Sequence, residues 1–111
     1  MQRLGEDPEH VAAIQMRAGR LFLDADDAAA ATPLLEAAHA LCVERIPQQW
    51  PRGECAALLA ECRIAARQWQ SAVALAEEGV GLLRGSAAPP ERLARAEACL
   101  AAANARQDLD R

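Results

Sequence analysis

The residues with the most chemistry to offer in this sequence are its histidines and cysteines. His39 and Cys42 are three positions apart, so on a helix they would share one face. If the next helix runs back antiparallel across residues 47–51, Cys55 should lie level with Cys42. These three side chains could hold zinc or copper, although structural zinc normally takes four ligands at tighter spacing.

The cysteines have a simpler interpretation, which we favour. No two of them form a CxxC pair, and free cysteine is among the most buried residue types. The N-terminus has no apolar stretch like a signal peptide, so the expected compartment is the cytoplasm, where thiols stay reduced. We therefore expect structural thiols with no metal and no cofactor. The four cysteines are Cys42, Cys55, Cys62 and Cys99.

Recognisable catalytic motifs are missing from the sequence. It contains no GxSxG, no phosphate-binding loop and no HExxH. A nucleophilic pair of Cys42 with His39 lacks a third residue to orient the base. The acidic pairs 26–27 and 77–78 fall at a predicted turn and on a predicted helix surface. We expect that the protein is not an enzyme.

Size and charge exclude further classes. The chain has 111 residues, which allows one domain, and a net charge of −4, which argues against nucleic acid as a partner. No apolar run approaches the roughly 18 residues that a membrane span needs. All 12 basic residues are arginine and alanine is abundant, a composition that hints at a GC-rich bacterial genome.

Composition and periodicity together predict an all-α fold. Alanine, leucine, arginine and glutamate favour helix, and aromatics make up only 3%. Asp7 and Pro8 are typical of a helix start, and Thr32-Pro33 offers an alternative start for the second helix. The last helix should turn a polar face outward, with Glu91, Arg92, Arg95 and Gln107. The apolar spacing predicts five antiparallel helices, arranged as one hairpin over 8–46, a second over 52–84 and a capping helix over 90–107.

An internal repeat of 41 residues links these helices. Gly19, Ala60 and Ala101 fall in one register, and Ala31 and Ala72 in another. Small residues let helix backbones approach closely, and stacked hairpins bury faces that one hairpin alone would expose. The repeat predicts two and a half stacked hairpins.

The repeat resembles the tetratricopeptide repeat family, in its long-period bacterial form, over about residues 9–106. That family's hairpin has a small residue midway along its first helix, an aromatic nearby, and small residues in its second helix. Arg63 and Asn104 depart from the pattern, because they stand where an aromatic is expected. The residues that carry the resemblance are Gly19, Phe22, Ala31, Leu35 and Ala38 in the first unit, and Ala60, Trp69, Ala72, Ala76 and Gly79 in the second.

The resemblance implies an α-solenoid that binds another protein on the concave face lined by its first helices. The expected partner is a peptide or helical segment, and self-association through an exposed end is a further option. The alternatives are a metal-binding or enzyme-accessory bundle, and a fragment of a larger regulator with the same repeats. The residues expected to contact the partner are Arg20, Glu61, Ile64 and Arg95.

Overall fold

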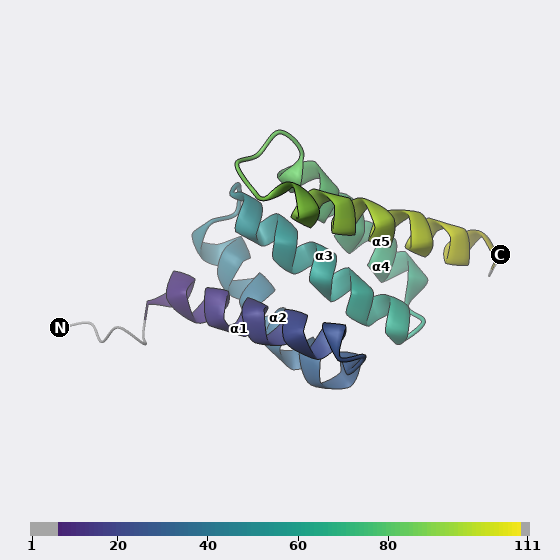
Figure 1. Ribbon diagram of the computed structural model, residues 1–111, viewed down its shortest axis with the longest axis horizontal. Helices are drawn as coiled ribbons and strands as arrows, with labels where there is room; N and C mark the ends of the chain where they lie inside the picture. The colour runs from purple at the N-terminus through teal and green to yellow at the C-terminus, as the bar shows by residue number, and fades with distance from the viewer. Residues whose placement is uncertain (1–6, 110–111) are drawn as a thin grey trace.

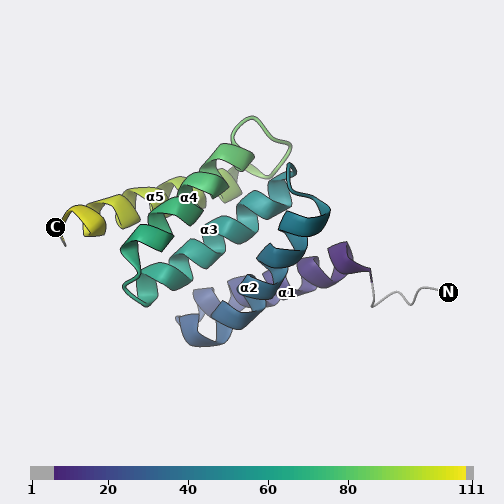
Figure 2. The same ribbon diagram turned by 180° about the vertical axis from the view of Figure 1, so that it is seen from behind.

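The computed structural model describes residues 7–109, and this part of the chain contains five α-helices and no strand. The first, third and fifth helices form one layer, and the second and fourth lie behind it (Figures 1 and 2). The predicted all-α stack of hairpins is confirmed. The helices are α1 (Pro8–Asp24), α2 (Ala28–Arg45), α3 (Trp50–Ala65), α4 (Trp69–Leu83) and α5 (Pro90–Leu109).

Local chemistry explains where the first two helices begin. The Asp7 carboxylate accepts a hydrogen bond from the Glu9 amide at 3.0 Å, and Pro8 follows in the first turn, as predicted. The Asp27 carboxylate caps α2 in the same way, through the Ala30 amide at 3.1 Å.

The structure excludes the alternative start of the second helix and shifts two predicted boundaries. Thr32-Pro33 does not start α2, because Asp27 caps the helix one turn earlier and Pro33 lies inside it. The Thr32 hydroxyl instead donates to the Ala28 carbonyl at 2.7 Å. Trp50, expected in a loop, begins α3, and α5 continues two residues beyond the predicted end at 107, as far as Leu109.

The two hairpin turns share one backbone conformation. Asp26 (φ 65°) and Arg67 (φ 60°) are the two non-glycine residues with positive φ in the described chain, and they are 41 positions apart. The repeat in the sequence is therefore also a repeat in the backbone.

Small residues stand at the close helix contacts, as the repeat predicts. Gly19, Ala31, Ala60 and Ala72 are all buried. A Cβ added to Gly19 would lie 2.6 Å from Leu35 Cγ, so α1 and α2 touch directly at this point.

A backbone-to-backbone contact joins α3 to α4 at Gly53 and Gly79, of which only Gly79 was part of the predicted repeat pattern. A Cβ on Gly79 would lie 2.8 Å from the Gly53 carbonyl oxygen, which is backbone and cannot give way. Gly53 and Gly79 stand 41 residues after Ala12 and Ala38, which are buried between α1 and α2. The second hairpin repeats the first at this crossing, with closer backbones.

Candidate functional site

Two rows of ion pairs cross the layer formed by α1, α3 and α5. The first row is centred on Glu54, the one buried charged residue in the described chain, which is 5% exposed. Arg20 of α1 donates to Glu54 Oε2 at 2.9 Å. Arg92 Nε of α5 lies 2.8 Å from the same oxygen, an ion pair by distance but at an angle unsuited to a hydrogen bond.

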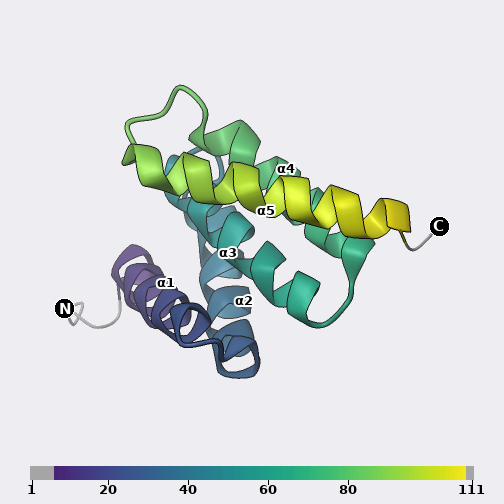
Figure 3. The same cartoon turned by 45° about the vertical axis from the view of Figure 1, so that its right-hand side comes forward.

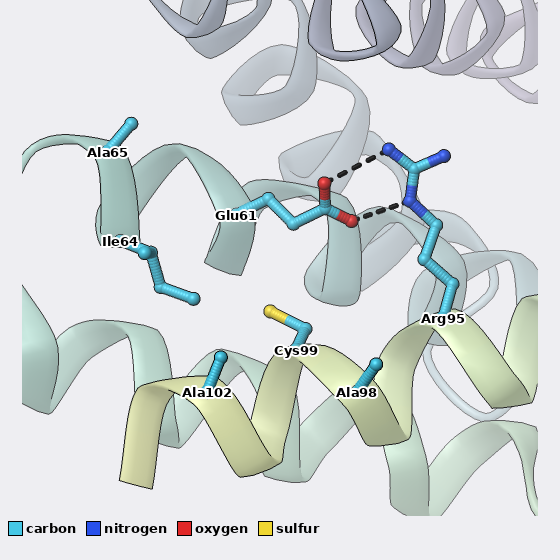
Figure 4. Close-up of a pocket in the computed structure, with 7 residues that line it drawn as sticks. All are labelled: Glu61, Ile64, Ala65, Arg95, Ala98, Cys99 and Ala102. Atoms are coloured by element: carbon cyan, nitrogen blue, oxygen red, sulfur yellow. Dashed lines mark hydrogen bonds and ion pairs between the residues drawn. The ribbon is translucent and has the colours of Figure 1, made fainter. Parts of the chain in front are cut away.

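The second row is centred on Arg95. Its guanidinium donates to both Glu61 oxygens, with Nε at 2.6 Å and Nη2 at 3.0 Å (Figure 4). Nη2 also lies 3.0 Å from Asp24 Oδ1, so this arginine of α5 reaches across α3 to α1. The Glu61 hydrogen bonds and the nearby carboxylates raise the pKa of Arg95, which stays charged.

A groove of about 420 Å³ lies beside the second row, between α3 and α5. Three of the four predicted contact residues, Glu61, Ile64 and Arg95, line it (Figure 4). Arg20 does not, because Glu54 holds it in the first row. The charged residues of the groove pair with each other, so a ligand there would meet mostly apolar side chains. The remaining lining residues are Ala65, Ala98, Cys99 and Ala102.

The cysteines are free and buried, as expected. Cys42 and Cys55 do lie level, with their sulfur atoms 4.0 Å apart. His39 does not join them, because its Nε2 donates to Glu78 Oε2 of α4 at 2.6 Å. Residues 7–109 contain no cluster of three or more His, Cys, Asp or Glu side chains that could hold a metal. Burial raises the pKa of the Cys99 thiol to about 12, so it is protonated at neutral pH.

The outward face of α5 corrects the predicted polar cap in part, because Glu91 is exposed as expected but the two arginines are not. Arg92 and Arg95 turn inward to Glu54 and Glu61. The exposed face instead carries a row of alanines, which we call the alanine face. Its members are Ala94, Ala98, Ala101 and Ala105.

The repeat register shows what this face corresponds to. Forty-one residues earlier, α3 has Gly53, Ala57, Ala60 and Ile64, and it packs on α4 through them. Forty-one residues earlier again, α1 packs on α2 through the equivalent face. The alanine face is therefore the surface that both counterpart helices cover with a second helix. The sequence contained this information, because the four alanines continue the 41-residue register.

The opposite end of the stack, at α1, is also open (Figure 3). Ile14 and Leu21 are 56% and 62% exposed. Their counterparts 41 residues on, Cys55 and Cys62, are buried against the first hairpin. Both ends of the described stack thus expose faces that are covered within it.

Comparison with known proteins gives no relative: no family model matches the chain, and no curated protein or solved structure matches it either. Among the described residues, no helix combines the length and apolarity that crossing a membrane requires.

Proposed function

We propose that this protein is a non-catalytic, tetratricopeptide-like interaction module, and that its alanine face binds a helix of a partner protein. The observation that supports this most is the shared register of the three first helices. In α1 and α3, the face at this register packs against α2 and α4, the second helices of the same hairpins. In α5, the equivalent face is exposed.

A helix is the occupant that fits this face best. Alanine side chains leave the α5 backbone open to close approach, as glycine and alanine do where α3 meets α4. An extended peptide that bound by adding a strand would need an unpaired strand edge, and the described residues contain no strand. The partner helix should itself carry small residues at the crossing, because α4 contributes Ala72, Ala76 and Gly79 to the equivalent layer.

The concave groove is the second candidate surface. Ile64 and Ala102 give it an apolar floor. Arg20, Glu61 and Arg95 are engaged in ion pairs with other helices of the chain. Recruiting them for a ligand would break pairs that link α1, α3 and α5, so we place the partner at the alanine face instead.

Matched charge substitutions distinguish the two surfaces. Ala94→Glu with Ala101→Glu puts two charges on the alanine face, and Ala102→Glu puts one in the groove. The control, Ala40→Glu with Ala74→Glu, adds the same two charges at exposed positions of α2 and α4. The measurement is crosslinking mass spectrometry with the full chain as bait.

We expect the partner to bind the parent chain, the control and Ala102→Glu, and to be lost from the double variant on α5. Crosslinks should map the partner to α5. If Ala102→Glu alone abolishes partner binding, the partner binds in the groove instead. Self-association would appear as a dimer of the parent chain in sedimentation, abolished by the same α5 substitutions.

A further inference from the structure

Three sulfur atoms converge at the centre of the first hairpin and α3. Cys55 Sγ lies 3.3 Å from Met16 Sδ and 4.0 Å from Cys42 Sγ. The three residues come from three different helices, α1, α2 and α3, and each is buried. Cysteine and methionine are the soft ligands of proteins, and their sulfur atoms bind soft metal ions best.

The cluster can be reached from solvent. Met16 and Cys42 both line a pocket of about 230 Å³ next to the start of α3. Gln49, Trp50 and Pro51 form another side of the pocket. Cys55 does not line it, but its sulfur atom lies within 4.0 Å of those of Met16 and Cys42, which do.

We propose that Met16, Cys42 and Cys55 form a binding site for one Cu(I) ion. Three sulfur atoms at about 2.3 Å from a central ion are about 4.0 Å from one another. The two cysteine sulfurs already have this separation. The Met16 sulfur lies 3.3 Å from Cys55 Sγ and would have to move away from it, which its flexible side chain allows.

The ligand set favours Cu(I) over zinc. Two thiolates and a thioether form a soft, three-coordinate set, whereas structural zinc takes four ligands, usually cysteine and histidine. The one nearby histidine, His39, is engaged by Glu78.

Binding releases two protons. The Cys42 and Cys55 thiols lose one each, and two S–Cu bonds form, so Cu⁺ and two thiols give a singly negative Cu(SR)₂ unit with the neutral Met16 sulfur as third ligand. No electron is transferred. The charged groups near the two cysteines are Glu9, Glu54 and Glu78, which oppose this charge, and Arg52, which favours it and is paired with Glu78. Because protons are released, affinity should rise as the pH rises.

The test titrates the full chain with Cu(I), supplied as its bicinchoninate complex under nitrogen with reductant. The parent chain should remove one equivalent of copper from the indicator. Cys42→Ala should abolish this competition, and Met16→Leu, which conserves volume, should weaken binding by roughly 10–100-fold. The matched controls, Cys62→Ala and Cys99→Ala, also empty buried thiol positions and should bind like the parent.

Three results would overturn the site. They are no competition by the parent chain, unchanged binding by either Met16→Leu or Cys42→Ala, and a mass lower by two hydrogens with no copper bound. The last would mean that Cys42 and Cys55 had formed a disulfide instead. Circular dichroism of each variant establishes that lost binding is not lost folding.

Discussion

Glu54 is the residue on which the inner layer most depends. Its carboxylate is buried and has two arginine partners, Arg20 and Arg92, which are themselves only partly exposed. A buried ion pair is weak evidence for net stability, but removing one member leaves the others uncompensated. Glu54 therefore fixes the positions of α1 and α5 relative to α3.

We expect Glu54→Gln to lower the free energy of unfolding by about 3 kcal/mol, because two guanidinium groups lose their shared carboxylate. The matched control is Glu36→Gln, which also removes a carboxylate paired with an arginine, Arg63, but at a half-exposed position. The control should cost less than about 1 kcal/mol. Urea denaturation measures both, and equal losses would contradict the assigned role of Glu54.

Glu78 makes the folding stability of the protein depend on pH. Burial alone would raise its pKa, but hydrogen bonds from Arg52 and His39 outweigh burial and hold the pKa below its ordinary value of 4.5. Its folded-state pKa is thus lower than its unfolded-state pKa. The stability that Glu78 contributes is present above the ordinary value and is lost as the pH falls through the lowered one.

We therefore expect Glu78→Gln to be less stable than the parent by about 1 kcal/mol at pH 7, with the gap closing as the pH falls through the lowered pKa of Glu78. Denaturation curves across this range measure the gap. The same comparison in a His39→Gln background separates the imidazole from the carboxylate. A gap that does not narrow as the pH falls below 4.5 would contradict the assignment.

At the scale of single helices, the distance between two packed helices decides which glycines can be substituted. Gly53 and Gly79 let α3 and α4 cross with backbone against backbone. Gly81, two positions along the same helix as Gly79, faces open space, with nothing within 4 Å of an added Cβ. One helix thus contains a glycine required by packing and one that packing does not require.

Gly79→Ala should destabilise the protein by about 2–3 kcal/mol, because its Cβ would meet the Gly53 carbonyl and Ala57. Gly81→Ala should stabilise it by about 0.5–1 kcal/mol, because alanine is the better helix former. Thermal unfolding compares the two. If both variants melt above the parent, α3 and α4 do not cross as closely as described.

The helices themselves were largely predictable from sequence, and the ion pairs were not. Caps such as Asp7-Pro8 and apolar spacing act over a few residues, so the sequence displays them directly. The partners of Arg92 and Arg95 depend on how α5 rotates about its axis against α3. The polar residues of the last helix predicted a polar outer face, but Arg92 turns inward to Glu54 and Arg95 to Glu61 and Asp24.

At the scale of the whole molecule, the described stack repeats one packing arrangement twice and exposes the equivalent face on its last helix. Each first helix has a face for its own second helix, and α1 and α3 use it. The four alanines of α5 continue that face in register. The repeat was visible in the sequence, but which side of α5 remained exposed required the structure.

The most direct test of the alanine face adds a helix that can pack on it. The chain is continued after Arg106, the position 41 residues after Ala65, with a second copy of residues 66–84, which form a hairpin turn and α4. If the alanine face accepts a helix, the added segment should fold onto α5. Urea denaturation should then show a single transition with a higher midpoint and a steeper dependence on urea, because more surface is buried. In the Ala94→Glu, Ala101→Glu variant, the same extension should leave the urea midpoint and slope unchanged. If the extended chain has the same urea midpoint and the same slope as the parent chain, the alanine face is not a helix-binding surface.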